Sequence, residues 1–327
     1  MAHERSPHRE LIRTLKWYST NVIPFLIPLL LALQTSTVNP KLTALADAQA
    51  KVGYTDHAAM VRENVRAERA LKAMMDADEL KTADDFFAAT ELLDNAPGYE
   101  SRLLIHEWAV SALVLGHPDA VKRVKLTWDR LQLASGRPQR FGIMTRRNDA
   151  GESVPRPTDP TLASLTPATG TDNPELRTLH EADYADRKGS MDAAVVGPRD
   201  DARRARVLAI LKEGRATTGE DAYNAASVMQ HGDDYADFML AHELCLSAIA
   251  RGYKGGAWLL SRTYDRMLES GGQAQRFDTQ LTPDGKMNYV LNVATPGPSD
   301  TTRRLFGAES RAYLRAKTAA WEASIKG

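Results

Sequence analysis

Residues 103–112 read LLIHEWAVSA and residues 239–248 read MLAHELCLSA, so a His-Glu pair in an apolar setting occurs twice, with an offset of 136 in the numbering. The same offset aligns residues 82–141 with residues 218–277 without a gap, and 17 of the 60 aligned positions are identical. A period of this length is far above the roughly 34 residues of a short helical repeat, so each copy is a domain-sized unit. We therefore infer an internal duplication.

The pattern of the second copy is helical. Residues 201–214 carry apolar side chains at helical spacing. A second helix is expected to begin near Thr218, with Glu220 and Asp221 in its first turn, and to end at Gly232. Two further helices are expected, and each is followed by a glycine: residues 235–251 and 256–270.

The first copy repeats this plan, which sets the expected architecture. Short strands are expected after Phe141 and Phe277, and a closing helix is expected over residues 301–325. The sequence thus predicts a mainly α fold with two homologous helical-bundle repeats of four helices each, pseudo-two-fold symmetry and minor short strands. The expected divisions are a leader (1–48), a first repeat (55–145), a linker with a connecting helix (146–200), and a second repeat with a C-terminal helix (201–327).

The N-terminal segment has the features of an export signal. Basic side chains are spread over residues 1–21, Val22–Leu33 is an unbroken apolar run, and Ala46-Asp47-Ala48 is an A-x-A tripeptide. This order is typical of a signal peptide, whereas a membrane span needs about 20 apolar residues. We expect a signal peptide or membrane anchor and an extracytoplasmic protein, with membrane contact through Val22–Leu33 if the segment is kept. An amphipathic or buried N-terminal helix is the alternative.

Composition excludes several classes of protein. The 327 residues include 42 basic and 42 acidic side chains, which argues against a nucleic-acid partner, because affinity for phosphate comes from accumulated Lys and Arg. Cys245 is the only cysteine, which rules out an internal disulfide and a multi-cysteine metal site. No complete phosphate-loop, dinucleotide or serine-hydrolase motif occurs. We therefore predict no metal site and no cofactor.

Polar side chains recur on the apolar faces of the predicted helices. Burying such groups is costly unless they are paired, so we expect a network of hydrogen bonds and ion pairs. Two interpretations remain open: a structural network that fixes helix register, and an acid/base site in which an arginine holds an anion. The expected members of the structural network are His106, Glu107, Asp129, Arg130, Gln139, His242 and Glu243.

The clearest difference between the copies is Gln230-His231-Gly232, which the first copy lacks. His231 lies at a predicted helix end, where the helix dipole favours its protonated form. It is either a helix cap or a titrating group near Asp265. In the second interpretation His231 and Asp265 are catalytic, and the expected substrate-binding residues are Gln230, Arg266, Gln275, Arg276 and Gln280.

The same motifs resemble those of a bacterial family. Gln-His-Gly at 230–232, Asp-Arg at 265–266 and GQAQRFDTQ at 272–280 are similar to the Q-H-[GA], D-R and G-x-x-Q-x-[YF]-G-T-Q motifs of an uncharacterised family of helical, often exported proteins. The resemblance covers residues 201–315 and reaches the first copy only through the duplication. The chain departs from the pattern at Asp278, where the family has glycine. The resemblance supports the domain boundaries and assigns no chemistry.

Two functions follow from the sequence. The first is an exported or membrane-tethered helical protein that binds an unknown small molecule or protein, because no complete catalytic motif is present. The alternative is a hydrolase- or lyase-type enzyme in which His231 and Asp265 form an acid/base pair, while Arg266 and Gln275 hold the substrate. The two differ in whether these side chains converge on an open pocket.

Overall fold

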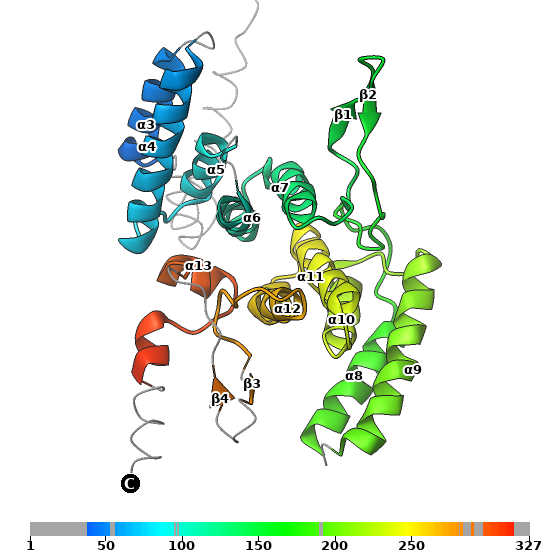
Figure 1. The fold of residues 1–327 in the computed structure, drawn as a ribbon. Coiled ribbons are helices and arrows are strands. Elements are labelled where there is room, and N and C mark those ends of the chain that lie inside the picture. The colour runs from blue at the N-terminus through cyan, green and yellow to red at the C-terminus, as the bar shows by residue number, and fades with distance from the viewer. Residues whose placement is uncertain are drawn as a thin grey trace, which may run out of the picture. The chain divides into compact units, whose positions relative to one another are not determined.

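The computed structural model describes residues 38–52, 56–94, 96, 98–189, 192–280, 282–283, 289–290 and 297–316, which belong to one packed unit (Figure 1). Several expectations from the sequence fall outside these residues. The apolar run Val22–Leu33 lies outside them, as do most of the strand region at 281–293 and the last part of the expected closing helix, residues 317–325.

The described chain is mainly α-helical, as the sequence predicts. The helices before the first strand are α3 (Pro40–Lys51), α4 (His57–Asp76), α5 (Ala83–Leu92), α6 (Tyr99–Val114) and α7 (Ala120–Ala134). The helices between the two strand pairs are α8 (Pro174–Lys188), α9 (Ala193–Lys212), α10 (Gly219–Met229), α11 (Tyr235–Ala250) and α12 (Gly256–Ser270). α13 (Asp300–Leu305) follows the second strand pair.

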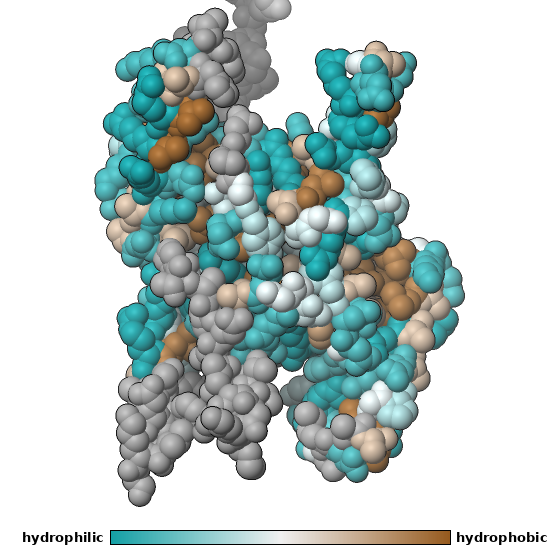
Figure 2. All heavy atoms as spheres, viewed as in Figure 1, coloured by the Kyte–Doolittle hydropathy of each residue, from teal (hydrophilic) through white to brown (hydrophobic). Residues whose placement is uncertain are grey.

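The short strands form two antiparallel pairs. β1 (Thr145–Arg147) pairs with β2 (Ser153–Pro155), and β3 (Thr282–Pro283) pairs with β4 (Tyr289–Val290). They follow Phe141 and Phe277, where the sequence predicts strands. The side chains of β1 and β2 are mostly exposed, and Figure 2 shows mainly hydrophilic residues over this hairpin.

Local chemistry explains where the helices begin and end. Thr82 and Asp85 form a capping box at the start of α5, and Thr218 and Asp221 form another at the start of α10. Such a box satisfies two backbone N–H groups that have no partner inside the helix. α6, α7, α11 and α12 are each followed by a glycine with a positive φ, which a residue without a Cβ adopts readily: Gly116, Gly136, Gly252 and Gly272.

The packing brings distant segments of the chain together. α6 packs against α5 and α7, α11 packs against α10 and α12, and α6 also contacts α11. In Figure 1, the pair α3–α4 and the pair α8–α9 lie on opposite sides of these central helices. One apolar core joins them, and its largest buried side chains include Trp108, Trp128 and Tyr264.

Two of the expected domain boundaries fall inside helices. The boundary at residue 48 cuts α3, which packs on α5 and whose Leu42 is buried in the core. The boundary at residue 201 cuts α9, because the helix begins at Ala193 and continues through Gly197 and Pro198. Gly197 and Pro198 have weak helix propensity, but the burial of Val207 and Ile210 in the core outweighs it.

Candidate functional site

Two buried ion pairs link residues that are far apart in the sequence. Glu107 on α6 pairs with Arg276 beyond α12, with Nε and Oε1 2.6 Å apart. Glu243 on α11 pairs with Arg140 beyond α7, with Nε and Oε1 2.8 Å apart. None of the four side chains is more than 7% exposed. The expected buried polar network is therefore present, with both glutamates in it.

His106 and His242 face each other at the centre of this network. Their Nε2 atoms are 3.5 Å apart, and each Nδ1 lies near a threonine hydroxyl, at 3.1 Å for Thr127 and 3.4 Å for Thr263. Burial lowers the pKa of His242 to about 3 and the pKa of His106 well below its usual value. Both rings are fully buried and stay neutral at physiological pH, so they serve the core and do not contact solvent.

Asp265 holds the loop that follows α12. Its carboxylate accepts hydrogen bonds from the backbone N–H groups of Arg276 (2.8 Å), Phe277 (3.0 Å) and Thr279 (3.0 Å), and from the Thr279 hydroxyl (2.7 Å). Asp129 accepts bonds from three backbone N–H groups of the loop after α7 in the same way. Burial raises the pKa of Asp265 to about 6. Both aspartates are fully buried, so we no longer assign Asp265 to an acid/base pair with His231.

Gln275 and Arg276 also brace this loop and take no part in the pocket described next. Gln275 is fully buried and donates to the carbonyl of Gln280 at 2.7 Å, while its own Oε1 accepts from the Gln280 N–H at 2.8 Å. Gln139 makes the matching pair of bonds with Met144. The amide of Gln275 is bonded within the loop, and the guanidinium of Arg276 is bound to Glu107. Neither residue is therefore available for the substrate-binding role that we expected from the sequence.

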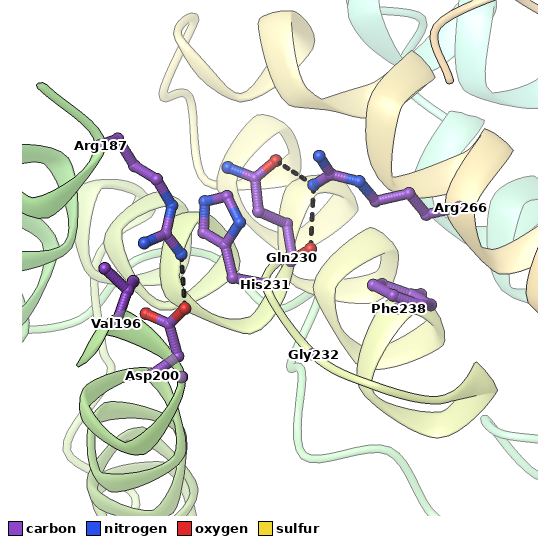
Figure 3. A pocket seen from close by; sticks show the side chains of 9 residues that line it. Arg187, Val196, Asp200, Gln230, His231, Gly232, Phe238 and Arg266 are labelled. Carbon is purple, nitrogen blue, oxygen red and sulfur yellow. Dashed lines mark hydrogen bonds and ion pairs between the residues drawn. The ribbon is translucent and has the colours of Figure 1, made fainter. Parts of the chain in front are cut away.

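A pocket of about 420 Å³ opens where α8, α9, the α10–α11 turn and α12 meet (Figure 3). This volume lies within the range of about 300–1,000 Å³ that is usual for small-molecule sites. Three of the expected catalytic and substrate-binding residues line it, namely Gln230, His231 and Arg266. The other lining residues are Arg187, Val196, Gly197, Asp200, Gly232 and Phe238.

Arg266 reaches the pocket from α12. Its Nη1 donates to the backbone carbonyl and the Oε1 of Gln230, both at 2.9 Å, and its Nε donates to Oε1 of Gln280 at 3.0 Å. All three acceptors are neutral, and no carboxylate of the described residues lies within ion-pair distance of Arg266. Burial lowers the pKa of Arg266, and the nearby charges of Arg262 and Arg187 lower it further. The charge of Asp183 acts in the opposite direction.

The other arginine that lines the pocket is already paired. Arg187 on α8 donates a hydrogen bond to Asp200 at 2.7 Å, and Figure 3 marks this interaction. Arg203 also pairs with Asp200, at 2.5 Å. Behind them Asp183 is almost fully buried, with an Oδ1 that is 3.4 Å from Arg187 and accepts no hydrogen bond from a described residue. Burial raises the pKa of Asp183 to about 6, although Arg187 and Arg203 oppose the shift.

His231 lies between Arg187 and Gln230 in Figure 3. Its Nε2 is 3.5 Å from Oδ2 of Asp183, so Asp183 takes the place that we expected Asp265 to have. Burial lowers the pKa of His231 to about 3, and Arg187 and Arg266 act in the same direction. At neutral pH the ring is uncharged, and its contact with Asp183 is not an ion pair.

Sequence reasoning missed the half of the pocket that α8 and α9 supply. Asp183, Arg187 and Val196 lie in residues 146–200, where we expected a linker with a connecting helix, and Phe238 lies in a predicted helix to which we assigned no functional residue at that position. The caps were a usable signal, since Asn173-Pro174 and Asp192 are good helix starts. Arg130, expected in the central network, instead pairs with Asp94 at 2.6 Å.

Comparisons with models of known protein families, with curated proteins and with solved structures found no match to this chain. Among the described residues, no group of three or more His, Cys, Asp or Glu side chains is placed to hold a metal ion. Every helix in the described ranges falls short of the length and apolar character that a membrane crossing requires. We take the pocket of Figure 3 as the candidate site, because Gln230, His231 and Arg266 line it.

Proposed function

We propose that this protein binds a small anionic molecule in the pocket around Arg266. The observation that carries the proposal is the guanidinium of Arg266, whose described partners are all neutral. Arg266 is partly buried, and a charge that is partly removed from water without a counter-charge is destabilising. An anionic ligand would supply the missing charge, and the neighbouring Gln230 and His231 would add hydrogen bonds.

Binding is favoured over catalysis by the protonation state of His231. A general base works best when its pKa lies near the operating pH. The pKa of His231 is about 3, which makes the ring a weak base at neutral pH. The hydrolase or lyase alternative keeps one supporting observation, the contact of His231 with Asp183, and it would need a ligand that raises the pKa of the histidine.

A thermal-shift screen of the whole chain against small acids, bases and neutral compounds tests the proposal. Compounds that raise the melting temperature are expected to be anions, because only an anion compensates Arg266. Arg266→Gln should abolish these shifts. Arg130→Gln is the matched control in the first half of the chain, and it should keep them. Hits that are mainly cations, or anions that act equally on Arg266→Gln, would overturn the proposal.

We further propose that the chain is a tandem duplication of a five-helix unit with approximate two-fold symmetry. The starts of α4, α5, α6 and α7 precede those of α9, α10, α11 and α12 by a constant offset of 136 in the numbering, and the offset from α3 to α8 is 134. The crossed ion pairs support the same unit, because Glu107 and Glu243 are related by that offset. In an experimental structure, superposing residues 56–141 on 192–277 should need a rotation of about half a turn, and a much smaller rotation would contradict the symmetry.

We also propose that the protein is exported or tethered by its N-terminal segment, as the basic region and the apolar run Val22–Leu33 suggest. We propose likewise that residues 201–315 belong to the exported helical family that they resemble. This proposal rests on the motifs around Gln230 and Arg266. Both fit a protein that collects a small molecule outside the cytoplasm.

A further inference from the structure

The first half of the chain contains a carboxylate, that of Asp94, at the position that Gln230 occupies beside the proposed anion site in the second half. The offset that relates the two copies aligns Asp94 with Gln230 and Arg130 with Arg266. Nη1 of Arg130 donates to the backbone carbonyl of Asp94 at 2.8 Å and to its Oδ1 at 2.6 Å. Nη1 of Arg266 contacts the carbonyl and side-chain oxygens of Gln230, both at 2.9 Å. The bonding pattern is kept, and only the negative charge is lost.

The residues around the arginine also differ between the two halves. In the first half, Asp94 also pairs with Arg123 at 2.7 Å, and its backbone carbonyl accepts a bond from Arg102 at 2.9 Å. The residues aligned with these two arginines in the second copy are Leu259 and Phe238. The second half therefore has a single arginine from this set, an amide in place of the carboxylate, and an apolar side chain, Phe238, where the first half has Arg102. Phe238 lines the pocket together with Val196.

The number of uncompensated charges limits the charge of the ligand. Arg187 is already paired with Asp200, so among the lining residues Arg266 supplies the one positive charge that has no direct ion pair with a described carboxylate, although Asp183 interacts with it from farther away. A carboxylate carries one negative charge at neutral pH, whereas a phosphate monoester carries about 1.5 to 2. A monoanion matches one guanidinium, and a dianion would keep excess charge near the buried carboxyl group of Asp183.

We infer that the ligand of this pocket is a small monocarboxylate with an apolar substituent, and that Asp94 is its internal counterpart in the first half. The inference rests on the proposed anion site and specifies its chemistry. The carboxylate contacts Arg266, whose Nη2 makes no hydrogen bond to a described residue. The apolar substituent lies against Val196 and Phe238.

Titration of the full chain with sodium benzoate, benzamide and inorganic phosphate, followed by NMR, tests this inference. Benzoate should bind at least tenfold more tightly than benzamide, which has the same shape without the charge, and more tightly than phosphate. Gln230→Glu and Gln230→Asp place a carboxylate beside Arg266, as Asp94 does beside Arg130. Either change should weaken benzoate binding at least tenfold and leave the melting temperature unchanged or higher.

The outcomes separate this inference from the proposed function. Phosphate binding that is tighter than benzoate binding, and is lost in Arg266→Gln, would overturn the monocarboxylate but keep the anion site. Equal binding of benzoate and benzamide, or full benzoate affinity in a folded Gln230→Glu, would overturn the role of the charge. If none of the three probes binds, both the inference and the proposed function fail for ligands of this size.

Discussion

Glu107 and Arg276 are ion-paired at 2.6 Å although 169 residues separate them in the chain. Both side chains are at most 3% exposed. The second pair, Glu243 with Arg140, spans 103 residues in the opposite sense, since here the arginine comes first. Each half of the chain thus provides the counter-charge that the other half needs in its interior. Neither half can bury its own glutamate with a partner unless the other half is folded against it.

Loss of one arginine from these pairs should therefore destabilise the whole fold. Arg276→Met leaves Glu107 buried without its ion-pair partner, and we expect the free energy of unfolding to fall by about 3–5 kcal/mol. Urea denaturation at pH 7 measures the change. Lys41→Met, which breaks the exposed pair with Glu79, is the control and should cost less than about 1 kcal/mol. Similar losses for both variants would show that burial of the pair has no special effect.

Asp265 and Asp129 should be equivalent in their contribution to stability. Replacement of Asp265 by Asn keeps the size of the side chain but turns one acceptor oxygen into a donor facing N–H groups. We expect Asp265→Asn and Asp129→Asn each to lose about 2–4 kcal/mol, because several hydrogen bonds to a charged acceptor are broken. Ligand binding by the folded Asp265→Asn protein should persist. Loss of ligand binding in a fully stable Asp265→Asn variant would restore this residue to the functional site.

The sequence predicts the helical core better than it predicts the pocket. Helix ends at Gly116 and Gly252, and the burial of His106 and His242, follow from local signals that act over a few residues. The pocket depends on the packing of α8 against α10. This packing places Asp183 beside His231, which lies just after the C-terminal end of α10. No periodicity or motif encodes that contact, since it results from tertiary packing. For the same reason the partner of Glu107 could not be identified from one sequence.

Acid should weaken the fold through the paired histidines. The pKa of His242 is about 3 in the folded protein and about 6.5 when unfolded. The unfolded chain therefore binds more protons below pH 6.5, and stability falls from that pH down to about 3. At pH 4.5 the loss is about 2–3 kcal/mol for this histidine alone.

Two carboxyl groups complicate the acid profile, so the histidine effect is measured as a difference between proteins. Asp183 and Asp265 have folded pKa values raised to about 6, and their contribution to stability is lost as the pH rises through that value. We compare how the free energy of unfolding changes between pH 6.5 and 4.5 in His242→Asn and in the unmodified protein. The difference between the two slopes is the contribution of His242. Equal slopes would mean that His242 is charged inside the fold.

Ligand affinity should also depend on pH, through Asp183. Its carboxyl group lies 3.5 Å from His231 and has a pKa of about 6. Protonation removes a negative charge near the bound anion, so benzoate should bind about three- to tenfold more tightly at pH 5 than at pH 7.5. Asp183→Asn should bind tightly at both values. Calorimetry measures the affinities, and an unchanged pH dependence in Asp183→Asn would contradict the assignment.

Cell fractionation tests the predicted export. The full-length protein should appear in the membrane or extracytoplasmic fraction, since the apolar run Val22–Leu33 follows a basic region. Replacing two leucines of this run by arginine should retain the protein in the cytoplasm. Recovery of the unmodified protein wholly in the soluble cytoplasmic fraction, with residues 1–40 intact, would refute export.

The separation of Glu107 from Arg276 has a consequence for synthesis on the ribosome. The nascent chain presents Glu107 first, and at about 5–20 residues per second its partner is added on the order of 10 to 30 s later. During that interval α6 carries an unpaired acidic side chain, Glu107, on the face that is buried in the folded protein. Glu107 therefore has no ion-pair partner until translation has nearly finished.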